Sequence, residues 1–230
     1  MKKRLVVLTG AGVSAESGLP TFRDSDGLWM GYDVYEVASP AGWKKDPSLV
    51  LDFYNKRRRE AAAALPNEAH HIIASLENNY KTTVITQNID DLHERAGSKN
   101  VFHLHGEIFK MRSEKDENTF YEIRGDISLG DKAPDGFQLR PHVVWFDEPV
   151  PNIPEARKII STAEVFILVG TSLQVYPASG LIDYLPANVV GYIIDKKPPY
   201  VSGHHNFQVI ENSATGGMRE LKKILASIRN

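Results

Sequence analysis

The chain has 230 residues, 42% of them hydrophobic, and a formal net charge of -2, which disfavours a general nucleic-acid or membrane-surface binder because both need a strongly basic surface. It contains no cysteine, which excludes disulfides, thiolate zinc sites and a cysteine nucleophile. No apolar run reaches the roughly 18 residues of a membrane span and the opening MKKRLVVLTG is too short for a signal peptide, so we expect a cytoplasmic protein.

Four short apolar runs rich in β-branched residues predict strands that are buried on both faces of a parallel sheet. They lie at 5–8, 83–86, 165–169 and 189–194. Helical patterns are found at 46–65 with Pro47 in the first turn, at 68–77 with Asn67 as the cap, and at 218–228. This alternation predicts an α/β fold with a Rossmann-like doubly wound parallel sheet, in which ligands bind at the carboxyl ends of the strands.

Residues 107–140 break this pattern. They are polar and charged, and Gly125, Gly130, Pro134 and Gly136 interrupt them. We interpret this stretch as a small inserted module rather than a strand-helix repeat. The Rossmann-like domain then consists of residues 1–106 and 141–230.

The first strand leads into Gly10-Ala-Gly-Val-Ser-Ala15, which fits the G-x-G-x-x-A pattern of a dinucleotide-binding turn. Its glycines permit close backbone approach, and the N-terminus of the next helix offers N–H groups to a diphosphate; a plain strand-helix turn is the alternative. An ordinary dehydrogenase continues with a second strand and an acidic residue. Here a loop follows instead, in which Phe22 can cover a ribose and Arg23 can pair with phosphate.

Polar side chains cluster after two other strands. Gln87, Asn88 and Asp90 lie at the end of the second strand, on the edge that faces the ligand. They could instead cap the following helix, but three polar residues in four exceed what capping needs. His105 precedes a glycine in FHLHGEI, and a neutral imidazole is the natural general base for a hydroxyl proton. The Gly170-Thr-Ser172 turn carries donors suited to phosphate or ribose oxygens.

These segments together resemble the sirtuin family of NAD-dependent protein deacylases along nearly the whole chain. GAGVSAESGLPTFR, TQNIDDLHERAG, the His105-Gly106 pair, RPHVVWF and GTSLQVYP occur in family order. The resemblance implies that the acyl-lysine carbonyl oxygen displaces nicotinamide from NAD, that His105 acts as general base, and that the products are nicotinamide, free lysine and O-acyl-ADP-ribose. It implies NAD as cosubstrate and acyl-lysine proteins as partners.

By the same resemblance, His105 and Asn88 are the catalytic residues. The implied NAD contacts are Gly10, Ala11, Gly12, Ala15, Thr21, Phe22, Arg23, Trp29, Gln87, Asn88, Ile89, Asp90, His105, Gly170, Thr171, Ser172, Asp195, Lys196 and Ala214. The implied substrate contacts are Ala38, Tyr54, Arg57, Val143, Val144, Phe146 and Val175. The segments 142–146 and 174–176 would supply strand edges that pair with the substrate backbone.

Tyr54 and Arg57 lie three residues apart on one helix and project from the same face. Spacing alone favours a half-buried tyrosine beside a solvated arginine. The Tyr-x-x-Arg pair nevertheless resembles the sirtuin subclass that removes succinyl and malonyl groups, in which both side chains bind the acyl carboxylate. Ala38 matches the small residue that leaves room for the longer acyl chain.

Three features depart from the family pattern: the missing zinc cysteines, Asp147 and Asp195. Most sirtuins hold a structural zinc with two cysteine pairs, but this chain has none, so we expect no zinc and a module held by packing. The residues expected to pack are Phe120, Tyr121, Ile123, Ile127 and Phe137. Asp147 stands where a glycine is common, and Asp195 where the family usually has Asn.

Three other functions remain as alternatives: mono-ADP-ribosyl transfer by the same site, a module that binds NAD or ADP-ribose without turnover, and an NAD dehydrogenase. The dehydrogenase is weakened by the missing second strand and ribose carboxylate. Target proteins, relative acyl preferences and the oligomeric state are left open by the sequence, which is compatible with a monomer.

Overall fold

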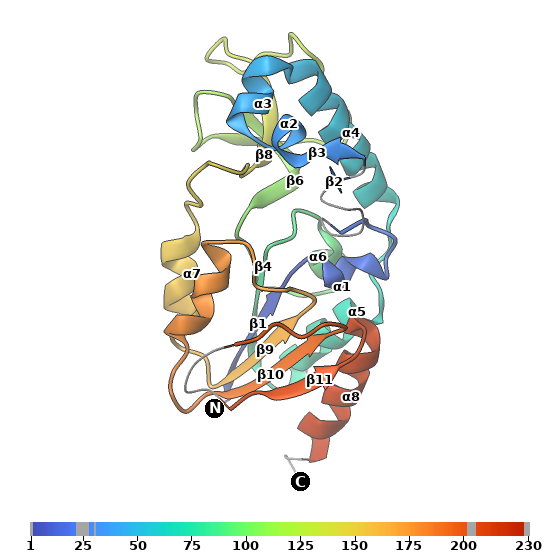
Figure 1. Cartoon of the computed structure of the whole chain (residues 1–230), viewed down its shortest axis with the longest axis vertical. Helices are drawn as coiled ribbons and strands as arrows, with labels where there is room; N and C mark the ends of the chain where they lie inside the picture. The colour runs from blue at the N-terminus through green and yellow to red at the C-terminus, as the bar shows by residue number, and fades with distance from the viewer. Residues whose placement is uncertain (1, 22–27, 30, 202–205, 228–230) are drawn as a thin grey trace.

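The computed structural model describes residues 2–21, 28–29, 31–201 and 206–227. A six-stranded parallel sheet forms the larger layer, in the order β11-β10-β9-β1-β4-β5 (Figure 1). The strands are β1 (Arg4–Thr9), β4 (Lys81–Thr86), β5 (Val101–His103), β9 (Val165–Val169), β10 (Val190–Asp195) and β11 (Gln208–Glu211). The four predicted strands and the Rossmann-like fold are confirmed, whereas β5 and the partly exposed edge strand β11 lack a long apolar run and were not predicted.

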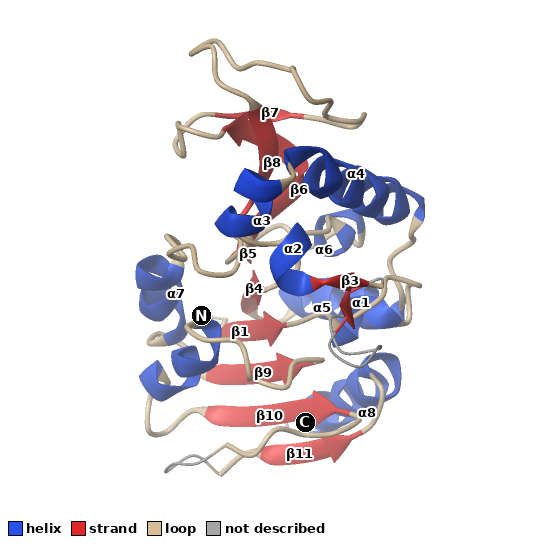
Figure 2. Ribbon diagram, turned by 45° about the horizontal axis from the view of Figure 1, so that its top comes forward, coloured by secondary structure: helices blue, strands red, loops and turns tan. Residues whose placement is uncertain are grey.

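Helices cover both faces of this sheet (Figure 2). One face carries α5 (Glu68–Ser75), the short η1 (Leu76–Asn78) and α8 (Ala214–Ser227), and the other carries α7 (Ile153–Ile160) and η2 (Ala178–Tyr184). In β1, Leu5 and Val7 pack on the side of α5 and α8, while Val6 and Leu8 pack on the side of α7 and η2. The uniformly apolar strands are therefore explained by burial on both faces. No helix in the described part of the chain is long and apolar enough to span a membrane.

The second layer combines helices with a small antiparallel sheet of order β7-β6-β8, whose strands are labelled in Figure 2. The helices are α2 (Val34–Val37), α3 (Pro40–Lys45) and α4 (Pro47–Ala63), and the strands are β6 (Gly106–Ser113), β7 (Phe120–Glu122) and β8 (Leu139–Val143). A two-residue hairpin pairs β2 (Leu28–Trp29) with β3 (Tyr32–Asp33). The inserted stretch thus contains all but the first residue of the strand β6, which its polar composition concealed. The domain boundaries themselves stay a prediction.

Helix α4 begins as predicted, with Asp46 accepting a hydrogen bond from the Leu49 N–H and Pro47 in the first turn. It is joined to the inserted stretch by a buried polar clamp. Arg58 is 0% exposed and donates to the Ile108 carbonyl at 2.8 Å, to Asn55 Oδ1 at 2.8 Å and to the Gly125 carbonyl at 3.3 Å. Asn55 in turn exchanges two hydrogen bonds with the main chain of Ile127.

Apolar packing supports the inserted stretch only in part. Ile127 is buried with Leu51, Ala133 and Leu139, and Tyr121 and Ile123 pack against that cluster. The expectation for Phe120 and Phe137 was wrong, because they are 47% and 44% exposed and lie beneath lysine ammonium groups. Hydrogen bonds from the buried Arg58 hold the inserted stretch to α4 in place of these two rings. An arginine gives no hydrophobic pattern, so the sequence did not indicate this role.

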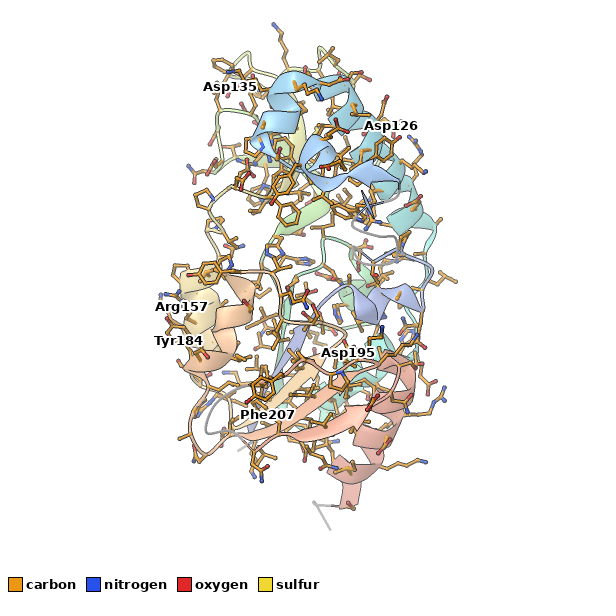
Figure 3. The ribbon with its side chains drawn as sticks, viewed as in Figure 1. Asp126, Asp135, Arg157, Tyr184, Asp195 and Phe207 are labelled. Atoms are coloured by element: carbon orange, nitrogen blue, oxygen red, sulfur yellow. The ribbon has the colours of Figure 1, made fainter. Side chains whose placement is uncertain are left out.

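Substitution Arg58→Met is expected to lower the free energy of unfolding by about 2–4 kcal/mol, because it leaves the carbonyl of the buried Ile108 and the side chain of the buried Asn55 without their donor and also removes the bond to the Gly125 carbonyl. Arg59→Met is the matched control. Arg59 forms an exposed pair with Asp126, which Figure 3 labels beside α4, and its loss is expected to cost less than about 1 kcal/mol. Urea unfolding measures both, and equal losses would contradict the clamp.

Candidate active site

A cavity of about 590 Å³ lies at the carboxyl ends of the parallel strands and extends to the second layer. Its lining contains every predicted site residue that the structure describes. These are Gly10, Ala11, Gly12, Ala15, Thr21, Trp29, Ala38, Tyr54, Arg57, Gln87, Asn88, Ile89, Asp90, His105, Val143, Val144, Phe146, Gly170, Thr171, Ser172, Val175, Asp195, Lys196 and Ala214. Phe22 and Arg23 lie outside the described residues. Residues far apart in the sequence therefore meet in one cavity.

Two glycine turns touch at the floor of the cavity. The Gly12 N–H donates to the Gly170 carbonyl at 2.9 Å, and a Cβ on Gly12 would lie only 2.8 Å from Gly170 Cα. Gly170 also has a left-handed backbone with φ 62°. These glycines are required first of all for the approach of the turns after β1 and β9.

The helix after the first turn differs from the expectation. Helix α1 (Gly12–Ala15) has only four residues, and its N–H groups are bonded within the protein: Gly12 to the Gly170 carbonyl, Val13 to Gly10, and Ser14 and Ala15 to Ala11. The prediction of a helix N-terminus with free N–H groups was therefore wrong for these residues. The Gly170 carbonyl, in the turn after β9, accepts the first of these N–H groups, that of Gly12.

Ser14 joins the polar residues that follow β4. The Asn88 side-chain amide donates to Ser14 Oγ at 3.1 Å, and Ser14 Oγ donates to Asp90 Oδ2 at 3.1 Å. All three residues are buried, and burial raises the pKa of Asp90 although the bonds from Leu92 and Ser14 partly oppose it. Sequence reasoning missed Ser14. The available signal was a hydroxyl between the apolar residues Val13 and Ala15.

His105 is held in one orientation by the strand that carries Gln87. Its ring Nδ1 lies 3.0 Å from the Gln87 carbonyl, which can only accept, so Nδ1 carries the proton and the neutral ring has its lone pair on Nε2. Burial lowers the pKa of His105, and the bond to Gln87 opposes this only in part. The Gln87 side chain meanwhile donates to Thr171 Oγ1 at 3.0 Å. The ring is thus a neutral base near pH 7.

His103 stands in a contrasting environment. Its Nδ1 lies 2.9 Å from the Asn88 carbonyl and its Nε2 lies 2.8 Å from Glu94 Oε1, so both nitrogens face acceptors. Burial lowers the pKa of His103, but the hydrogen bond and charge of Glu94 outweigh this and the pKa is raised. Protonation of this ring lets both nitrogens donate, to the Asn88 carbonyl and to Glu94, whereas His105 has one nitrogen left to accept a proton.

Among the described residues, the wall from the second layer is aromatic and carries one cation. Tyr54 is 1% exposed, packs edge-on against Phe53, and lies 6.4 Å, ring to ring, from Trp145. Arg57 has its guanidinium 4.9 Å from the centre of the Trp29 ring, and burial lowers its pKa while nearby Glu60 opposes the shift. The small Ala38 lies buried beside them.

A buried ion pair shapes the neighbouring turn at 143–148. Arg140 donates to both carboxylate oxygens of Glu148, at 2.7 and 3.1 Å, and its guanidinium lies over the Trp145 ring. Glu148 also accepts from the Trp145 N–H at 2.8 Å. Sequence reasoning missed Trp145 and Glu148 as lining residues, because the arginine that holds them is eight positions from Glu148.

The expected strand edges are shorter than predicted. Strand β8 ends at Val143, so residues 144–146 belong to no strand, and neither do residues 174–176. The Val144 N–H donates to the His105 carbonyl and the Phe146 N–H to the Ala38 carbonyl. Asp147, where the family commonly has glycine, adopts the left-handed φ of 66° that glycine would favour.

The far end of the cavity is formed by β10 and α8. Asp195, labelled in Figure 3 at the end of β10, accepts a hydrogen bond from the Lys197 N–H at 2.8 Å, and α8 begins at Ala214. Glu16 was not predicted; it accepts from the Thr215 N–H and hydroxyl. Among the described residues, no group of three or more His, Asp or Glu side chains is placed to hold a metal ion.

The Sir2 family model matches residues 10–177 of the chain. An NAD-dependent protein deacylase of Helicobacter pylori (strain ATCC 700392 / 26695) is 52% identical over 219 residues, which cover 95% of this chain and 96% of the relative. The chain belongs to the Sir2 family.

Solved Sir2 structures have the same fold. A Sir2 homolog–NAD complex is 37% identical with a TM-score of 0.86, over 100% of this chain and 91% of that one. A Sir2 variant with a deacetylated p53 peptide and 3′-O-acetyl ADP-ribose is 28% identical with a TM-score of 0.82, over 97% and 94% of the two chains. The sirtuin resemblance in the sequence is thereby confirmed.

The two histidines of this Sir2 chain are expected to titrate on opposite sides of the ordinary value of 6.5. In NMR spectra of the ring nitrogens, the pKa of His105 is expected below 6.5, with its neutral proton on Nδ1, and the pKa of His103 above 6.5. Variants His105→Asn and His103→Asn assign the signals. A His105 ring that titrates above 6.5, or that carries its neutral proton on Nε2, would contradict the proposed orientation.

Proposed function

We propose that this Sir2 protein is an NAD-dependent protein deacylase that acts on lysines whose acyl group ends in a carboxylate, succinyl or malonyl, and also on acetyl-lysine. NAD-dependent deacylation rests on membership of the family and on relatives named NAD-dependent protein deacylases. The acyl preference rests on one observation: Tyr54 and Arg57 both line the cavity that contains His105.

The cavity residues fit a dinucleotide. Hydroxyl, amide and carboxylate groups line its lower part, and its floor includes the main chain of Gly10, Gly12 and Gly170, which lack the Cβ atoms that would push the two turns apart. When bound, NAD supplies a ribose carbon from which nicotinamide can leave. We assign the glycine turns, Thr171, Ser172, Asp195, Lys196 and Ala214 to nucleotide binding.

The residues beside the reacting ribose have separate roles. His105 Nε2 accepts a proton from a ribose hydroxyl, because its other nitrogen is occupied by the Gln87 carbonyl. The amide of Asn88 and the carboxyl of Asp90 orient the nicotinamide end, since Ser14 holds both side chains in place. Before reaction, burial of this network excludes water from the bond that breaks.

The acyl end of the substrate would meet the second layer. A guanidinium can form two charge-assisted hydrogen bonds with a carboxylate, and the Tyr54 phenol can donate a third. Burial raises the pKa of Tyr54, so its hydroxyl keeps the proton that it donates. The alternative was that Arg57 is solvated. Its guanidinium instead lies over the Trp29 ring, inside the cavity wall.

Substitution Arg57→Met is expected to reduce kcat/KM for succinyl-lysine peptides by about 100-fold, because charge-assisted hydrogen bonds to a carboxylate contribute about 3 kcal/mol in total. Acetyl-lysine peptides of the same sequence are expected to lose less than about threefold. Nicotinamide release with matched acetyl, succinyl and malonyl peptides measures the effect.

Arg59→Met is the control, because Arg59 is exposed and its partner is Asp126. Its activity on all three peptides is expected to equal that of the wild type. An equal loss of desuccinylation and deacetylation in Arg57→Met would remove the carboxylate assignment. Mass spectra that show ADP-ribose on a peptide that retains its acyl group would instead indicate mono-ADP-ribosyl transfer.

A further inference from the structure

Among the described residues, five carboxylate side chains line the cavity: Glu16, Asp90, Asp147, Glu148 and Asp195. Four of them already hold hydrogen bonds. Glu16 accepts from Thr215, Asp90 from Ser14 and Leu92, Glu148 from Arg140 and Trp145, and Asp195 from the Lys197 N–H. Within the described part of the chain, the Asp147 carboxylate has no hydrogen-bond or ion-pair partner, and the residue is exposed.

The backbone of Asp147 has a positive φ, which is rare for a residue other than glycine. Asp147 and Leu173 are the two non-glycine residues with positive φ among the described residues, at 66° and 53°. Asp147 lines the cavity, and so do Ser172 and Val175 on either side of Leu173. Strained backbone of this kind is retained where the surrounding site requires it. The two segments therefore form rims of the same opening.

Both rims keep main-chain groups available for an extended chain. The structure shows no hydrogen bond from the N–H groups of Asp147, Val175 or Tyr176 within its described residues. A peptide that adds a strand between such segments is held by its main chain, which gives little side-chain selectivity. The free carboxylate at Asp147 is then the charge that such a peptide meets at the rim.

We propose that Asp147 selects substrates in which Lys or Arg flanks the acylated lysine. This inference rests on the proposed function, because it requires a peptide in the opening. A cation beside the acylated lysine complements the unpaired carboxylate, whereas an acidic neighbour is repelled by it. The acyl carboxylate is recognised separately, by Arg57 on the second layer.

The test uses succinyl-lysine peptides whose two immediate neighbours are both Arg, both Ala or both Glu. Asp147→Asn removes the charge and keeps a residue that tolerates positive φ. Asp52→Asn is the matched control, because Asp52 is exposed on α4 and does not line the cavity. Peptide affinity and kcat/KM are both measured, at low and at high NaCl.

The wild type is expected to prefer the Arg peptide over the Glu peptide about fivefold, as for an exposed ion pair, and less at high salt. Asp147→Asn is expected to reduce this ratio below about twofold, with the Ala peptide unchanged and Asp52→Asn like the wild type. Deacylation with the same ratio in Asp147→Asn would overturn the inference and leave the proposed function intact. Charge-selective binding without deacylation would support the inference and contradict the proposed function, and no peptide binding would overturn both.

Discussion

The contact between the Gly12 and Gly170 turns determines how the cavity is built. Because neither residue has a side chain there, the ends of β1 and β9 approach to the distance of a main-chain hydrogen bond. Ser14, two residues beyond Gly12, then reaches Asn88 and Asp90. Thr171, next to Gly170, reaches Gln87, whose carbonyl orients His105. The orientation of the base thus depends on two glycines from different strands.

Helix α4 links the second layer to the chemistry. Tyr54 and Arg57 line the cavity, while the next residue after each, Asn55 and Arg58, bonds to the inserted stretch. A shift of one position rotates a helical side chain by about 100°, so one helix serves two surfaces. In a chain without cysteine, the buried arginine provides fixed hydrogen bonds to main-chain carbonyls of that stretch. Acyl recognition and the stability of the second layer are consequently coupled.

Local patterns predicted the parts whose environment is uniform. The apolar run at 165–169 is buried on both faces, and Pro47 and Asn67 mark helix starts through their own backbone chemistry. The position of Asn88 at the ligand-facing edge of the sheet followed from the strand end before it, whereas its pairing with His105 came from the family resemblance. Strand β6 escaped prediction because polar residues interrupt its apolar pattern, and the role of Arg58 escaped it because the Ile108 and Gly125 carbonyls that it contacts are at least 50 positions away in the sequence. The prediction of free N–H groups at the start of α1 failed because the Gly12 N–H bonds to the turn after another strand.

The most direct measurement is the affinity of Gly12→Ala for NAD by calorimetry, in protein whose circular dichroism matches that of the wild type. The added Cβ would meet Gly170 and separate the two turns, so NAD affinity is expected to fall at least tenfold. Gly125→Ala, where nothing lies within 4 Å of the added Cβ, is expected to bind like the wild type. Wild-type NAD affinity in Gly12→Ala would contradict the dependence of the site on this contact.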